Sequence, residues 1–157
     1  DIIVRFWIED NLVQYIGIEG SYRRELNSLL VQDWQSYSVP EILKRYSTPS
    51  YIELIEIENS PYYRLTLSYE SLGIELSYVV PFQFLENGKS ELCFNLQNVD
   101  FIGLSLFSPE KVKDIPVGII PNRLDSFTSW ETTTGLSKED FGQLMENYEN
   151  QPCIVVD

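Results

Sequence analysis

The sequence predicts an α+β protein in which antiparallel β-meander sheets carry short helices packed on one face. Three observations support this class. Apolar and polar residues alternate along 62–80, as in antiparallel strands with one covered face. Turn-forming residues at 9–11 and 87–88 separate apolar runs, as in β-hairpins. Amphipathic stretches near 39–46 and 138–148 are each followed by a proline and an extended apolar run.

The first predicted element is a hairpin made from "IIVRFWI" and "LVQYIGI", joined by the turn at 9–11. Residues of a strand alternate between its two faces, so the even-numbered apolar residues of the first strand share one face. This strand is too apolar to lie comfortably in water. It is therefore either an interior strand or one that a neighbouring subunit completes. The candidate interface residues are Ile2, Val4, Phe6 and Trp7 from this strand, together with Trp34 and Trp130 from irregular segments.

The stretch 39–46 is predicted to be a short helix. Ser38 lies three residues before Glu41, the spacing of a capping box, and Pro40 falls in the first turn, where its missing N–H costs nothing. Pro49 prevents the helix from continuing. A helix of about two turns is marginal alone, so this one must depend on packing against a sheet.

The central region is predicted to contain several antiparallel strands. "YIELIEIE" and "YYRLTLSYE" flank a turn at 59–61, Gly73 closes the next turn, and 87–88 mark a further hairpin before the strand "DFIGLSLF". In the second of these strands the pattern predicts an inward set of Tyr63, Leu65, Leu67 and Tyr69, and an outward set of Arg64, Thr66, Ser68 and Glu70.

The C-terminal part repeats the order of helix, proline and strand. Residues 109–135 are predicted to be a long surface connection. Ser137 then caps a helix with Asp140 three positions later, and Pro152 precedes the short strand "CIVV". The whole chain, 1–157, is predicted to form one domain, or two lobes divided into 1–36 and 37–157.

Composition restricts the possible functions. The 157 residues carry a formal charge of −13, which disfavours nucleic-acid binding because a phosphate backbone is bound by Lys and Arg. The chain has no histidine, so His-dependent catalytic triads and imidazole metal ligands are absent. No run of 18 apolar residues and no P-loop, GxSxG or GxGxxG motif is present. We therefore expect no cofactor, no metal, no transmembrane segment and no enzymatic activity.

Carboxylates offer the alternative to this expectation. Glu53, Glu56 and Glu58 lie close together in one predicted strand and could serve a carboxylate-based hydrolase acting on surface glycans. A solvated strand face explains the same residues more simply. The many tyrosines similarly allow a carbohydrate-binding module, although most of them fall at core-facing positions.

The two cysteines, Cys93 and Cys153, are too far apart in sequence for a CxxC metal or redox motif. They are compatible with one disulfide or with two reduced thiols. In an extracytoplasmic protein the two are expected to pair.

The run "SVPEILKRYSTPSYIEL…YYRLTLSYESLGIELSY" resembles a pattern of extracytoplasmic lipoproteins from Chloroflexota-type bacteria. In that pattern a short helix ends in Tyr-Gly-x-Pro-Ser before a meander, and here Ser47 stands in place of the glycine. "TTGLSKEDFGQLMENYENQPCIVV" is similar to the terminal segment of the same proteins. More distantly, the layout resembles the BamE (SmpA/OmlA) fold.

The resemblance implies an extracytoplasmic domain at the cell surface or secreted, with a lipid anchor on a segment upstream of Asp1. It brings no catalytic residues with it. It implies a non-catalytic protein-protein interaction or structural domain, which binds a protein partner or self-assembles at the cell surface.

Overall fold

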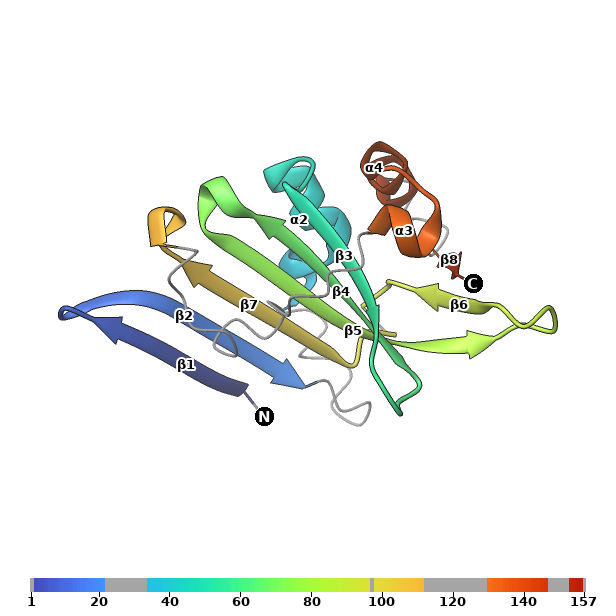
Figure 1. Cartoon of the computed structure of the whole chain (residues 1–157), viewed down its shortest axis with the longest axis horizontal. Coiled ribbons are helices and arrows are strands. Elements are labelled where there is room, and N and C mark those ends of the chain that lie inside the picture. Colours follow the sequence, from blue (N-terminus) through green and yellow to red (C-terminus); the bar gives the residue numbers. More distant parts are fainter. Residues whose placement is uncertain (1, 22–33, 97, 112–129, 147–152, 157) are drawn as a thin grey trace.

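The structure is a computed structural model that describes residues 2–21, 34–96, 98–111, 130–146 and 153–156. It confirms the α+β class: antiparallel strands dominate the described residues and a few short helices accompany them (Figure 1). The strands are β1 (Ile2–Glu9), β2 (Leu12–Ser21), β3 (Tyr51–Glu56), β4 (Tyr62–Tyr69), β5 (Ile74–Phe84), β6 (Ser90–Cys93), β7 (Phe101–Phe107) and β8 (Cys153–Val156). The α-helices are α2 (Val39–Tyr46), α3 (Trp130–Thr134) and α4 (Lys138–Glu146), and 3-10 turns lie at η2 (Gln35–Tyr37), η3 (Glu70–Leu72) and η4 (Pro109–Lys111).

The strands form one main antiparallel sheet with a smaller extension. The main order is β1-β2-β7-β5-β4-β3, so β7 separates β2 from β5 and the sheet is not a simple meander. The end of β5 leaves this sheet to pair with β6, and β6 pairs with β8 (Figure 1). The long strand β5 therefore belongs to both parts.

The core lies on one face of the main sheet. Register places Leu65 of β4 opposite Leu54 of β3 and Tyr78 of β5, and opposed residues of a sheet point to the same face. These side chains are almost fully buried, in one cluster that also contains residues of α2, α3, α4, β6 and β8. The phenol of Tyr78 donates a hydrogen bond to the carbonyl of Tyr37, 2.8 Å away. The predicted inward set of β4 is buried as expected.

The helix α2 has the predicted bounds but not the predicted cap. The side chain of Ser38 makes no capping hydrogen bond, so the Ser38–Glu41 capping box is wrong. Ser38 is buried and contributes its carbonyl oxygen, which accepts the amide hydrogen of Ile42 at 3.0 Å. The helix ends at Tyr46, and the φ of +63° at Ser47 turns the chain out of the helix before Pro49.

The helix α4 carries the capping box that the sequence predicts. The amide of Asp140 donates to Ser137 Oγ at 3.1 Å, and the amide of Ser137 donates back to Asp140 Oδ2 at 2.9 Å. The Ser137 hydroxyl also donates to Asp140 Oδ2, at 2.7 Å, and this bond, together with the one from the Ser137 amide, lowers the pKa of Asp140 because both favour the ionised carboxylate. Positions 147 and 148 of the predicted helix, and Pro152, lie outside the described residues, as does 112–129 of the predicted connection.

Candidate functional site

The hairpin β1–β2 exposes a continuous apolar area. Register places Phe6 opposite Ile16 and Ile8 opposite Val13, so the even-numbered residues of β1 lie on the face that holds the core further along the sheet. Five large apolar side chains on this face are between 47% and 62% exposed, whereas the residues of the central strands on the same face are buried. We call them the hairpin surface: Ile2, Val4, Phe6, Ile8 and Val13.

The strand β1 is also an open edge. It stands at the end of the strand order, and no described strand pairs with its outer side. Natural edge strands are usually protected by Lys, Pro, bulges or short length. β1 has eight residues without Lys or Pro, and its only charged residues are Arg5 and Glu9. Its pairing with β2 has one irregularity, between Trp7 and Ile8, where the extra residue belongs to β2. The edge is thus long and apolar, and among the described residues it has little protection.

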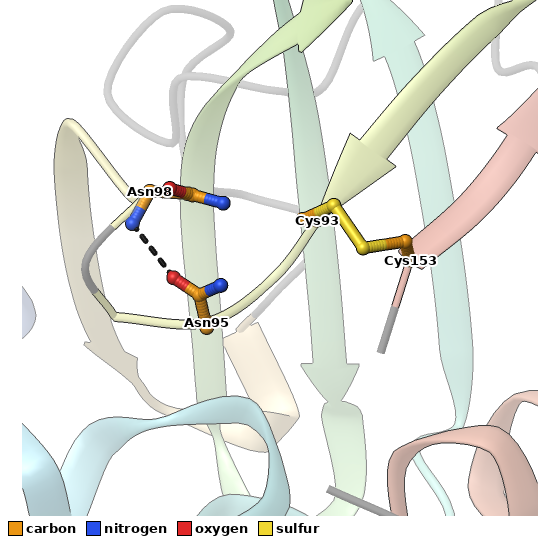
Figure 2. Close-up of a disulfide and its surroundings, with 4 residues drawn as sticks. All are labelled: Cys93, Asn95, Asn98 and Cys153. Carbon is orange, nitrogen blue, oxygen red and sulfur yellow. Dashed lines mark hydrogen bonds between the residues drawn. A yellow bond between two sulfur atoms is a disulfide. The ribbon is translucent and has the colours of Figure 1, made fainter. Parts of the chain in front are cut away.

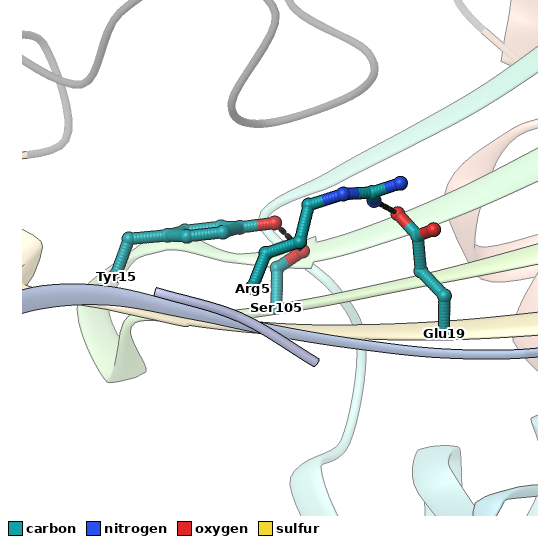
Figure 3. Close-up of polar contacts among 4 residues, drawn as sticks. All are labelled: Arg5, Tyr15, Glu19 and Ser105. Carbon is teal, nitrogen blue, oxygen red and sulfur yellow. Dashed lines mark hydrogen bonds and ion pairs between the residues drawn. The ribbon is translucent and has the colours of Figure 1, made fainter. Parts of the chain in front are cut away.

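The charge of Arg5 does not protect this edge, because the Arg5 side chain points toward β2. Figure 3 shows its guanidinium in an ion pair with Glu19, on the same side of the sheet as Tyr15 and Ser105. The phenol of Tyr15 lies over Gly17, where a Cβ would collide with it, and its oxygen is 3.2 Å from Ser105 Oγ. Burial raises the pKa of Tyr15. The hairpin is therefore tied to β7 by a buried polar contact as well as by strand pairing.

The three predicted interface tryptophans lie in different surroundings. Trp7 of β1 is partly exposed, on the face opposite the hairpin surface. Trp34 is partly buried, packs against the core and makes a tilted ring contact with Tyr37. Trp130 begins α3, is fully buried and meets Phe141 edge to face with 4.7 Å between ring centroids. Trp130 as an interface residue is therefore a wrong prediction, since its segment is a helix that packs into the core.

The second face of the main sheet holds a row of polar groups that are buried. Register aligns Glu53 of β3 with Thr66 of β4 and Ser77 of β5, and aligns Ser68 with Glu75 in the next row. The predicted outward residues Thr66 and Ser68 are 2% and 6% exposed, and Glu53 is 1% exposed. The expectation that this face is solvated is wrong at its centre.

Glu53 and Glu75 are the buried carboxyl groups of the described chain. Burial raises the pKa of Glu53 to about 7, the charge of Glu75 adds to the rise, and the guanidinium of Arg64 partly offsets it. Within the described residues, Glu53 Oε1 has no hydrogen-bond partner. A protonated carboxyl group near neutral pH is consistent with this environment.

The three glutamates of the sequence-based hydrolase alternative do not come together. Glu56 is exposed and has the opposite parity in β3, so it points away from Glu53. Glu58 is exposed in the turn after β3. The sequence offered no signal for Glu75, which lies on β5 and reaches the same face only through strand pairing.

Cys93 and Cys153 form a disulfide between the ends of two paired strands (Figure 2). They lie directly opposite each other in the β6–β8 register, with 4.1 Å between their Cα atoms. Next to it, the amide of Asn98 donates to Asn95 Oδ1 at 2.9 Å. The bridge therefore fastens the last strand to the smaller part of the sheet.

Other kinds of site find no support. In the described ranges, no three His, Cys, Asp or Glu side chains gather closely enough to share a metal ion. Among the helices that the structure describes, none combines the length and apolar character needed to cross a membrane. No family model, curated protein or solved structure matches the chain. The resemblance to extracytoplasmic lipoproteins stays a prediction.

Proposed function

We propose that this protein is a protein-protein interaction domain that self-associates through the hairpin surface and the open edge of β1. The observation that carries the proposal is the exposure of the hairpin surface, with Phe6 and Ile8 each 61% exposed. Contiguous exposed apolar side chains on a folded protein are typical of interaction sites.

Contacts between the apolar side chains of two β1 strands contribute to association. Complete covering of a half-exposed Ile, Val or Phe side chain stabilises a complex by roughly 1 kcal/mol, about half the value for full burial, and edge pairing covers part of each side chain. The hairpin surface contributes four such side chains from the β1 strand of each copy: Ile2, Val4, Phe6 and Ile8. Strand pairing at the β1 edge adds backbone hydrogen bonds and fixes the orientation of the partner.

The lack of net charge on the hairpin surface favours a second copy of the chain as its partner. The chain carries −13 overall, so two copies repel each other over most of their surfaces. None of the five side chains of the hairpin surface is charged, and the charge of Arg5 is balanced by Glu19. Two copies therefore meet here with the least repulsion, and each copy supplies an identical open strand.

We further propose that the protein acts outside the cytoplasm. The supporting observation is the disulfide between Cys93 and Cys153, because such bridges persist in oxidising compartments and are rare in reducing ones. This location agrees with the resemblance to surface lipoproteins.

The first test introduces charge into the proposed contact. The double variant Val4→Lys/Phe6→Lys is expected to be monomeric at concentrations where the natural protein is a dimer, because pairing would bring four ammonium groups together on one face of the joined sheet. Both positions are about half exposed, so the fold should be retained. Sedimentation or light scattering measures the size, and circular dichroism checks the fold.

The control is Leu72→Lys in η3, which adds a lysine at an equally exposed position away from the hairpin. This variant should remain dimeric. A natural protein that stays monomeric at high concentration would contradict self-association. The hairpin surface would then be covered by another protein or by another segment of the same chain.

A carboxylate-based hydrolase is the second candidate, and it is favoured by the buried pair of Glu53 and Glu75. Burial and the charge of Glu75 raise the pKa of Glu53 to about 7, and a carboxyl group that titrates near neutral pH is a candidate general acid. Soluble polysaccharides are the substrates to try. Saturable hydrolysis that Glu53→Gln abolishes and Glu56→Gln preserves would establish this candidate, and the absence of turnover in the natural protein would remove it.

A further inference from the structure

We propose a specific register for this association: two β1 strands pair antiparallel across a twofold axis that passes through Phe6. This inference rests on the proposed self-association. It follows from the length of β1, the alternation of its faces and the place of its one basic residue.

The sheet geometry limits the possible registers. When two edge strands join across a twofold axis, each face of one sheet continues into the same face of the other. Opposed residues must then lie on the same face, so an even-numbered residue faces an even-numbered one. In a twofold pair of identical strands, the numbers of two opposed residues add to a constant, which here must be even.

Only two such registers use most of β1. With strand bounds of Ile2 and Glu9, an axis at Arg5 pairs residues 2–8 with each other, and an axis at Phe6 pairs residues 3–9. Axes at Val4 or Trp7 pair only five residues in each copy. Because each added pair brings backbone hydrogen bonds and side-chain contacts, the two longer registers are favoured.

Charge decides between the two longer registers. An axis at Arg5 sets the two Arg5 residues directly opposite each other, so two side chains of like charge, each turned toward Glu19 of its own copy, share one position of the interface. An axis at Phe6 instead sets Arg5 opposite the uncharged Trp7 of the second copy and leaves each Arg5–Glu19 ion pair as it is. The same axis brings two Phe6 rings together on the face of the hairpin surface, with Val4 opposite Ile8 on either side.

The test uses two matched double cysteine variants, which both replace Ile8 and leave residues 5–7 intact. Of the two longer registers, only the axis at Phe6 sets the cysteines of Val4→Cys/Ile8→Cys opposite each other. Only the axis at Arg5 does so for Ile2→Cys/Ile8→Cys. Within one copy these positions are at least four residues apart along a strand, on the order of 13 Å, so neither variant can close on itself. The natural cysteines are joined and leave no free thiol.

Mild oxidation followed by non-reducing gel electrophoresis reads the result. We expect most of the Val4→Cys/Ile8→Cys chains as covalent dimer and the other variant as monomer. The reverse pattern would overturn the Phe6 register while leaving self-association intact. If the natural protein is a dimer but neither variant forms a covalent dimer, both edge-pairing registers are wrong and face-to-face packing is favoured. A monomeric natural protein would instead contradict the proposed function itself.

Discussion

Replacing both Cys93 and Cys153 by serine is expected to lower the free energy of unfolding by about 4 kcal/mol. The bridge joins residues 60 positions apart, and closing a loop of that length restricts the unfolded chain by about this amount in the chain-entropy model. The strand β8 has only four residues, and among the strands it pairs with β6 alone. Without the bridge, what holds β8 in the described part of the structure is this short pairing and the packing of its buried side chains. Urea denaturation of the two proteins measures the difference.

Reduction provides the control for this prediction. The natural protein with its disulfide reduced should have the same stability as the double serine variant, since both lose the same crosslink. Titration of thiols in the denatured, unreduced protein should find none. Two reactive thiols would show that the bridge is absent, and would remove the main support for an extracytoplasmic location.

The second large effect is expected from Glu53→Gln, and it depends on pH. The pKa of Glu53 is about 7 in the folded protein and 4.5 as the reference value for the unfolded chain, so the folded state binds the proton more tightly. Below pH 4.5 the contribution of Glu53 to the free energy of unfolding is fully present. This contribution falls as the pH rises from 4.5 to 7 and is lost above pH 7. The total change in the free energy of unfolding is at most about 3 kcal/mol. Glutamine remains uncharged, so the variant should lack this loss.

The difference between the two proteins is the informative quantity, because other groups titrate equally in both. The variant should gain stability relative to the natural protein between pH 5 and pH 8, as measured by denaturation at several pH values. Glu56→Gln is the matched control, since Glu56 is an exposed residue of the same strand on the opposite face. A constant difference across this range would mean that Glu53 titrates as an ordinary surface carboxyl group.

Local sequence patterns predicted much of the fold. The bounds of α2, the Ser137–Asp140 cap of α4 and the hairpin turn between β1 and β2 all depend on residues within a few positions of one another. The failed cap at Ser38 shows the limit of such rules. The spacing to Glu41 was correct, but Ser38 is buried and helix α2 starts without a side-chain cap.

The candidate sites depended on contacts between distant segments, and were harder to predict. Alternation shows which residues of β4 share a face, but not that both faces are buried there. Glu53 consequently looked like a surface residue, although it lies buried near Glu75. Trp130 looked exposed because its neighbours resemble a loop, and its place in the core depends on Phe141. The apolar character of β1 could be recognised from the sequence, because the composition of one strand does not depend on which segments lie next to it in the fold.

The position of β7 between β2 and β5 has a consequence for synthesis of the chain. The inner edge of β2 stays open until β7 has been made, so residues 22–107 must be added before the hairpin joins the main sheet. At about 5–20 residues per second this takes several seconds. During that time the apolar strands β1 and β2 have no third strand to pair with, and such segments are prone to aggregate with other nascent chains. Chaperones that hold extended apolar segments should therefore bind this protein early, while the hairpin is still without β7.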